Sequence, residues 1–362
     1  MGHRDSRQGA VSGSNPSEKT DDPNLAERKR PPTLYDIAKR AQTSPTTVSL
    51  VLNNKWRDHR IKPETAAHVE RIAAEANFSV NLQARGLRLA RSGLAGMIVP
   101  NYQNRFFSGL SERFEEAARS RGLCPAVIST RRDPEREHDA VTVLLAQKVE
   151  SLFIVGASDP GPLDALCRQA DTPHINLDIP GDGTSVVSDN PLGAYLLASR
   201  LLQTLAETQG ADPADLVFIG GYSGEYATSE RIKGFSRAMA ECGYEAAPER
   251  LITCGYSLGD VEAALSSLYG SQGRLPAGLF VNSIEAFEGA VQFIKGLPSD
   301  EFMRLALGCF DWNPFATFLP IPVIMVRQDV STMVERAFEF IDGATPPESG
   351  LIHIPPVLVD PR

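Results

Sequence analysis

The chain has 362 residues, of which 42% are hydrophobic and 22% are charged. This composition excludes disorder throughout, and no apolar run approaches the ~20 residues that a membrane-spanning helix needs. The five cysteines are scattered and form no C-x-x-C pair, so we expect no disulfide scaffold, no metal site, no cofactor and a cytoplasmic location.

Residues 1–31 predict a disordered tail, because they are rich in polar residues and contain almost no apolar ones. They lack the apolar core of about 7–15 residues that a secretory signal needs. The basic run Arg28–Arg30 in this segment is either an arm that contacts phosphates or part of a solvated tail.

Residues 32–78 predict three short helices that form a compact head. The pattern Thr33–Asp36 has the form of a capping box, and Ser44 before Pro45 is a second helix start. A third apolar-periodic stretch begins at Pro63. The following segment is basic and only weakly helical, so we expect it to order when it is bound.

The net charge supports a division between this head and the rest of the chain. Residues 1–31 carry a net charge of +1, residues 32–92 carry +5, and residues 93–362 carry −15. A small basic module joined to a large acidic body is typical of an anion-binding head on a soluble domain.

From Leu94 onward, short β-rich runs alternate with amphipathic helices, which predicts an α/β body of parallel, doubly wound sheets. The expected strands are 94–99, 124–129, 151–155, 174–177, 185–187, 216–220, 251–254, 278–281, 305–310 and 323–327. Their number favours two lobes, the first at about 94–190 and 327–345, the second at about 191–326 and 346–362. Ligands in such folds bind outside the carboxyl ends of the strands, which here places them between the lobes.

Two motifs carry a family resemblance. The stretch TLYDIAKRAQTSPTTVSLVLNN, which starts at Thr33, resembles the helix-turn-helix of the lactose-repressor (LacI/GalR) family of bacterial transcription regulators, and NFSVNLQARGLR, which starts at Asn77, resembles its hinge. The long connector NNKWRDHRIKPET is similar to that of the fructose and sucrose repressors and the catabolite repressor-activator. The resemblance covers roughly residues 32–360 and implies a head at 32–78, a hinge helix or linker at 79–93, and a periplasmic-binding-protein-like effector and dimerisation domain at 94–362.

The resemblance implies a repressor that binds a near-palindromic operator in double-stranded DNA as a homodimer or tetramer, under the control of a sugar or sugar phosphate. The second helix of such a head enters the major groove, and a leucine of the hinge pries open a base step in the minor groove. Pro45 and Leu50 offer only apolar contacts, so direct readout of bases should be sparse. The expected DNA contacts are Tyr35, Ser44, Pro45, Thr46, Thr47, Ser49, Leu50 and Asn53 in the head, and Asn81, Ala84, Arg85, Leu87 and Arg88 in the hinge.

For the effector, the resemblance points to polar residues in SERIKGF, GLFVNS and GCFDWNP and to aromatic residues near strand ends. An arginine and an aspartate that face each other across a cleft suit the hydroxyl groups of a sugar. The expected contacts are Phe107, Asp178, Asp189, Arg231, Asn282, Asp311 and Trp312. Each charged residue could instead form a structural ion pair, and each aromatic could belong to the core.

Other functions remain as alternatives: a head that binds protein, a plain linker in place of the hinge, a solute-binding protein for transport, or a sugar-modifying enzyme. The six histidines lie far apart and form no H-E-x-x-H motif, so we expect no catalytic residue. The glycine-rich segment Gly220–Gly224 lacks the spacing of a nucleotide-binding loop and predicts a tight turn.

Overall fold

A computed structural model describes residues 32–76, 78 and 92–361. They belong to two compact units, the head within Met1–Asn81 and the body within Leu82–Arg362. The predicted tail at 1–31 and the predicted hinge contacts between Asn81 and Arg88 lie outside the described residues. None of the helices in the described part of the chain is both long and apolar enough to cross a membrane.

The head contains the three helices that the sequence predicts: α1 (Leu34–Arg40), α2 (Pro45–Leu52) and α3 (Pro63–Glu75). The capping box of α1 is present, because the Asp36 N–H donates to Thr33 Oγ1 over 3.3 Å and the Asp36 carboxylate accepts from the Thr33 N–H over 2.7 Å. One small apolar core joins the helices, formed by Ile37, Ala38, Ala41, Val48, Val51, Ala66, Val69, Ile72 and Ala73.

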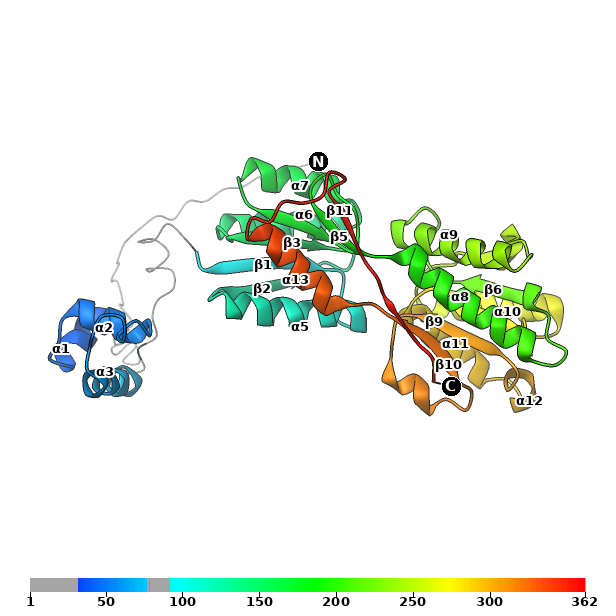
Figure 1. Ribbon diagram of the computed structural model, residues 1–362, viewed down its shortest axis with the longest axis horizontal. Coiled ribbons are helices and arrows are strands. Elements are labelled where there is room, and N and C mark those ends of the chain that lie inside the picture. The colour runs from blue at the N-terminus through cyan, green and yellow to red at the C-terminus, as the bar shows by residue number, and fades with distance from the viewer. Residues whose placement is uncertain (1–31, 77, 79–91, 362) are drawn as a thin grey trace, which may run out of the picture. The chain divides into compact units, whose positions relative to one another are not determined.

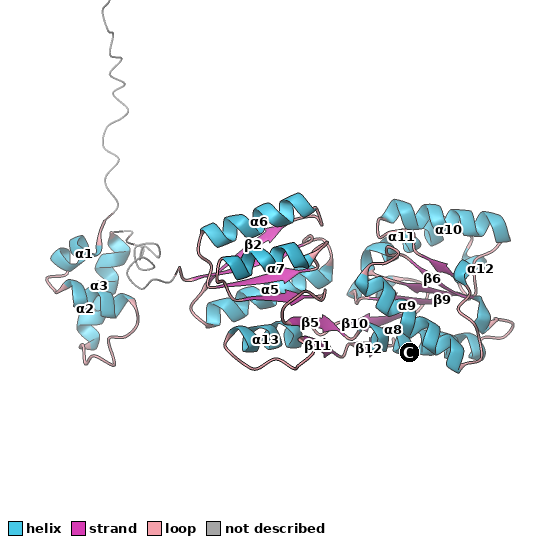
Figure 2. Cartoon of the chain, turned by 90° about the horizontal axis from the view of Figure 1, so that it is seen from above, coloured by secondary structure: helices cyan, strands magenta, loops and turns pink. Residues whose placement is uncertain are grey.

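The first lobe of the body is a parallel sheet of six strands in the order β11-β5-β4-β3-β1-β2. Its strands are β1 (Leu94–Val99), β2 (Cys124–Ser129), β3 (Ser151–Val155), β4 (His174–Leu177), β5 (Ser185–Ser188) and β11 (Leu351–Ile354). One face is covered by α5 (Arg105–Ser120) and α13 (Val330–Ile341), the other by α6 (Pro134–Ala146) and α7 (Pro160–Gln169) (Figure 2). All five residues of β3 are buried, as expected for a central parallel strand covered on both faces.

The second lobe repeats this plan in the strand order β12-β10-β9-β8-β6-β7. Its strands are β6 (Leu216–Ile219), β7 (Leu251–Ile252), β8 (Gly278–Val281), β9 (Ala306–Phe310), β10 (Val323–Arg327) and β12 (Val357–Val359). Its helices are α8 (Asn190–Glu207), α9 (Tyr226–Glu241), α10 (Leu258–Gln272), α11 (Ile284–Lys295) and α12 (Ser299–Phe302), with short 3-10 turns η1 (Pro213–Asp215), η2 (Pro248–Arg250) and η3 (Pro314–Phe318). The core on one face contains residues of α8 and α9, and that on the other contains residues of α10 and α11.

The last segment of the chain corrects one expectation. We expected all of residues 346–362 in the second lobe, but β11 pairs with β5 in the first sheet, and only β12 joins the second, antiparallel to β10. Figure 1 shows this segment, in red, running from one sheet to the other. The physical reason is that each sheet has an open edge beside the crossing, and each half of the segment satisfies the backbone groups of one edge.

Candidate functional site

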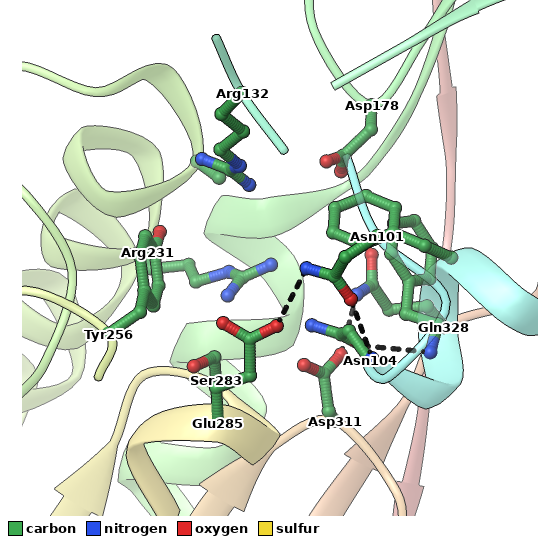
Figure 3. Close-up of a pocket in the computed structure, with 13 residues that line it drawn as sticks. Asn101, Asn104, Arg132, Asp178, Arg231, Tyr256, Ser283, Glu285, Asp311 and Gln328 are labelled. Atoms are coloured by element: carbon green, nitrogen blue, oxygen red, sulfur yellow. Dashed lines mark hydrogen bonds between the residues drawn. The ribbon is translucent and has the colours of Figure 1, made fainter. Parts of the chain in front are cut away.

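Residues that follow the strands of both sheets meet in one cavity between the lobes (Figure 3). Asn101, Asn104, Phe106, Phe107, Arg132 and Asp178 line it from the first lobe, and Ala227, Arg231, Tyr256, Ser283, Glu285, Asp311 and Gln328 complete it. The cavity measures only about 30 Å³, enough for one or two water molecules. A small-molecule pocket usually measures at least about 300 Å³. Any larger ligand therefore requires these side chains, or the lobes that carry them, to move apart.

Arg231 on α9 is held from three sides. Its side chain is buried, its Nε donates to Asn190 Oδ1 over 2.8 Å, and its Nη1 donates to the carbonyl oxygen of Asn282 over 2.5 Å. The guanidinium also lies 3.7 Å from the centre of the Phe310 ring, a cation–π contact. The charged end of this side chain is thus fixed in one orientation at the cavity wall.

Asp311 immediately follows β9 in a strained backbone conformation with φ of 113°, which non-glycine residues seldom adopt. Its carboxylate accepts from Gln328 Nε2 over 2.7 Å and from the Ile284 N–H over 3.2 Å. Burial raises the pKa of this carboxyl, an effect that Arg231 partly offsets. Arg231 and Asp311 therefore face the same cavity while each keeps its own hydrogen-bond partners.

Asp178 follows β4 with a positive φ of 70° and is 8% exposed. Burial raises its pKa to about 6, although Arg231 and Arg132 act in the opposite direction. Within the described residues, its Oδ1 atom has no hydrogen-bond partner, and neither has Nδ2 of the fully buried Asn190. Of these two residues only Asp178 lines the cavity, and its acceptor without a partner indicates a place where a ligand or water completes the bonding.

Polar contacts already span the cavity from lobe to lobe. Arg132 forms an ion pair with Glu225, which also accepts hydrogen bonds from Tyr256 and Thr228. Burial of Glu225 disfavours its charge, but Arg132 and these bonds outweigh that effect and lower its pKa. In the second contact, Asn101 Nδ2 donates to Glu285 Oε1 over 3.1 Å, as Figure 3 shows.

Four of the seven expected effector residues line the cavity, and three do not. The four are Phe107, Asp178, Arg231 and Asp311. Asn282 lies fully buried, bonded to Arg231 and through Nδ2 to Thr228 Oγ1. The carboxylate of Asp189 caps α8 by accepting from the Leu192 N–H over 3.0 Å, and Trp312 packs against the core of the second lobe. Helix capping and core packing thus occupy the side chains of these last two residues.

Sequence reasoning missed several cavity residues that share one signal. They are Asn101, Asn104, Arg132, Glu225, Tyr256, Ser283, Glu285 and Gln328. Most lie one to five residues after a strand that was predicted, so a search for polar residues at every strand end would have found them. The segment Gly220–Gly224 does form a turn, and Gly220, Gly221 and Gly224 all have positive φ. A Cβ at Gly221 would lie 2.3 Å from both Asn282 Nδ2 and Thr228 Oγ1, so only glycine fits there.

In the head, α2 presents the side chains that were expected at DNA. Ser44 Oγ caps the helix by accepting from the Thr47 N–H over 3.0 Å, Thr46 is exposed, and Leu50 is half-buried. Ser49 and Asn53 lie one turn apart, and Asn53 Nδ2 donates to the Ser49 carbonyl oxygen over 2.6 Å. Tyr35 on α1 is 73% exposed, so its side chain is accessible to a partner.

Comparison with known proteins identifies both units. Residues 33–81 match the family model of bacterial regulatory proteins of the lacI family, and residues 92–297 match that of periplasmic binding proteins and the sugar-binding domain of the LacI family. The second match alone covers more than half of the chain. The chain belongs to the LacI family.

Its relatives within the LacI family are transcription regulators. The ribitol operon repressor of Klebsiella aerogenes is 44% identical over 190 residues, which cover 52% of this chain and 70% of the relative. The catabolite repressor/activator of Escherichia coli K12 is 27% identical over 341 residues, 89% of this chain and 96% of the relative. The lac repressor dimer bound to operator has the same fold, with a TM-score of 0.73 at 22% identity, covering 91% of this chain and 98% of that chain.

These matches confirm the family resemblance and the predicted fold class. The LacI helix-turn-helix match contains α1, α2 and α3, and the binding-protein match contains the whole cavity except Asp311 and Gln328. This LacI-family protein is a DNA-binding regulator of transcription, with a head and a ligand-binding body in one chain.

Proposed function

We propose that this LacI-family protein is a cytoplasmic repressor that binds a near-palindromic operator as a homodimer and releases it when a sugar or sugar derivative enters the cavity between its lobes. The observation that carries the proposal is the cavity itself. It lies where strands of both sheets end, it is lined by Asp178 with one buried carboxylate oxygen that has no partner among the described residues, and the same chain carries a helix-turn-helix.

In the proposed operator complex, α2 lies in the major groove. Pro45, Thr46 and Leu50 contact base edges, while Tyr35, Ser44, Thr47, Ser49 and Asn53 contact phosphates. The hinge residues Asn81, Ala84, Arg85, Leu87 and Arg88 extend the contact into the minor groove, with Leu87 as the wedge. Only two or three side chains then read bases, so DNA deformability contributes much of the specificity.

The proposed switch follows from the size of the cavity. Because it holds only one or two water molecules, a ligand must displace the Arg132–Glu225 and Asn101–Glu285 contacts or rearrange them. Both contacts join one lobe to the other, so the ligand changes how the lobes are held. A ligand shifts operator affinity only by its differential affinity for the two arrangements, typically about 1–3 kcal/mol.

A symmetric dimer suits a near-palindromic operator, and the second lobe has an exposed apolar surface at which a second copy of the chain can bind. Phe315 and Phe318 of η3 are 66% and 80% exposed. An apolar groove of about 270 Å³, formed by residues of α11, α12 and the segment after η3, accompanies them. We propose that a second copy of the chain covers this surface, because a near-palindromic operator requires a symmetric dimer.

The test begins with selection of binding sites from a random duplex library by the full-length protein. The selected sequence should be a near-palindrome, and its binding should fall steeply with salt. Leu87→Ala should weaken binding to the selected site by about tenfold or more while sparing random DNA, because Arg85 and Arg88 supply the attraction that does not depend on sequence. Equal losses on both duplexes would refute the wedge. If the selection enriches no sequence from the library, the proposal that the protein binds a specific operator is refuted.

A further inference from the structure

We infer that the effector is an uncharged polyhydroxyl compound, not a phosphate ester, and that Glu285 and Asp178 enforce this choice. The inference rests on the proposed function of the cavity as the effector site. Three observations support it: the charges around the cavity, the contacts that already hold its two arginines, and the carboxylate oxygen of Asp178 that has no partner among the described residues.

The charged side chains around the cavity are mostly acidic. Four are carboxylates (Asp178, Glu225, Glu285 and Asp311) and two are guanidinium groups (Arg132 and Arg231). Burial favours the neutral forms of Asp178 and Asp311. Even when both are protonated, the two remaining carboxylates balance the two arginines. The cavity is therefore neutral or negative, whereas a phosphate ester brings a charge of about −1.5 to −2 at neutral pH.

The two cations are already engaged. Arg132 is paired with Glu225, and Arg231 is bonded to Asn190 and Asn282 while its face covers Phe310. A phosphate would have to remove Arg132 from the half-buried carboxylate of Glu225 and leave that carboxylate without its cation, which is costly in a partly desolvated site.

The helix N-termini near the cavity are also occupied, although such ends are common phosphate sites. At α5, the Asn104 side chain accepts from the Phe106 N–H and Asn101 accepts from the Gln103 N–H. At α11, Asp311 accepts from the Ile284 N–H and Ser283 from the Ala286 N–H.

At two other helix ends, those of α8 and α9, the residue before the helix is acidic. Asp189 caps α8, and Glu225 is the residue that precedes α9. A phosphate at any of these four ends would meet a carboxylate or displace a side-chain cap.

The carboxylate oxygen without a partner suits a hydroxyl group. Asp178 lines the cavity, and its Oδ1 can only accept while the carboxyl is ionised. A polyol supplies both a donor and an acceptor at each carbon, whereas an ionised phosphate only accepts and would repel Asp178. Glu285 adds a second acceptor, which is held at present by the Asn101 amide across the cavity.

The experiment uses the full-length protein and measures operator release and thermal stabilisation with matched pairs of compounds. The uncharged probes are tetritols, pentitols, hexitols, ribose and fructose; the charged probes are ribose 5-phosphate, fructose 1-phosphate and inorganic phosphate. We expect an uncharged probe to release the operator, and phosphate esters to need concentrations at least about 100-fold higher. Release by a phosphate ester at lower concentration than its parent sugar would overturn the inference.

Two variants test the named residues. Glu285→Gln keeps the shape and removes the charge, so it should reduce the discrimination against phosphate esters by about tenfold or more, and Asp178→Asn should do the same while weakening the uncharged effector. Glu288→Gln is the matched control, because Glu288 lies on the same helix with its side chain exposed, and it should change nothing. Unchanged discrimination in both Glu285→Gln and Asp178→Asn would overturn the assignment.

The outcomes also separate this inference from the proposed function. If a phosphate ester is the effector and Arg231→Ala abolishes the response, the cavity is the effector site and only the inference fails. If no probe stabilises the protein or releases the operator, the proposed effector site fails and the inference fails with it.

Discussion

Asp178 shows how a binding site can be kept at the expense of stability. The residue is buried, has a positive φ, and holds one carboxylate oxygen without a partner. Such an arrangement destabilises the ionised carboxyl, which is why its pKa rises from 3.8 to about 6. Because the folded-state pKa lies above the unfolded value, the residue lowers stability as pH rises from about 4 to about 6, and the loss is complete above that range.

We therefore predict that Asp178→Asn stabilises the protein at neutral pH, by at most about 3 kcal/mol for a shift of about two units. The gain should shrink as pH falls through about 6 and disappear near pH 4, where the wild-type carboxyl is protonated. Urea unfolding of both proteins across this pH range measures the effect. A constant difference at all pH values would show that packing, not charge, separates the two proteins.

A second prediction concerns Arg231 and Asp311, whose side chains both line the cavity. Arg231→Lys and Asp311→Asn should abolish the effector response while operator binding persists, because lysine cannot reproduce the two donors and the flat stacked face of the guanidinium. Arg231→Ala should also cost about 1–3 kcal/mol of stability, since it leaves the Asn282 carbonyl oxygen without its buried donor. Titration of operator binding with effector reports the response. A wild-type response in both conservative variants would place the effector elsewhere.

Among the elements, α2 of the head connects capping with DNA recognition. Ser44 begins the helix and satisfies the Thr47 N–H, and Pro45 occupies the first helical position, where its missing N–H costs nothing. Ser44 is also proposed to contact a DNA phosphate. Folding therefore requires a good helix cap at this position, whereas DNA binding requires an uncharged side chain.

The two demands can be separated by substitution. Ser44→Asp keeps a good N-cap and so should leave head stability within about 0.5 kcal/mol, but its charge should weaken operator binding by about tenfold or more. Ser257→Asp is a control for operator binding, because Ser257 caps α10 of the body with its Oγ accepting from the Asp260 N–H; the Asp260 carboxylate 2.5 Å from that Oγ should make this variant less stable. Anisotropy titrations with labelled operator, together with thermal melts, separate the two effects. Operator binding that Ser44→Asp leaves intact would remove Ser44 from the DNA interface.

At the scale of the whole molecule, η3 exposes a pair of phenylalanine side chains that would face solvent in a monomer. Phe315 and Phe318 lie with ring centres 6.1 Å apart, and both are mostly exposed. Contiguous exposed apolar surface of this kind marks an interaction site more often than a solvated one.

We predict that Phe318→Asp converts the protein to a monomer that loses operator binding, whereas Phe318→Leu keeps the dimer. Both lobes that enclose the cavity belong to one chain, so the monomeric variant should still be stabilised by effector. Sedimentation velocity, operator titration and thermal shift test the three parts. A Phe318→Asp protein that stays dimeric would place the dimer interface on another surface.

Local patterns predicted most of the elements, although not α12, β11 or β12, and the resemblance of two motifs indicated the family. The three head helices follow from caps and apolar periodicity within a few residues of each other, and the alternation of strands and helices predicts two parallel sheets. Family motifs also indicated Arg231 and Asp311, which line the cavity, and Asp311 directly follows a strand. These features depend on hydrogen bonds and side-chain directions that repeat over short distances along the chain.

What the sequence did not reveal depends on contacts between distant residues. Asn101 and Glu285 are 184 positions apart, and Arg132 and Glu225 are 93 apart, so only the packing of one lobe against the other brings them together. β11 and β12 were not predicted as strands, and the sheet that each joins depends on which edges lie open beside the crossing. The charge balance and the small volume of the cavity depend on which distant residues are brought together, so only the tertiary structure determines them.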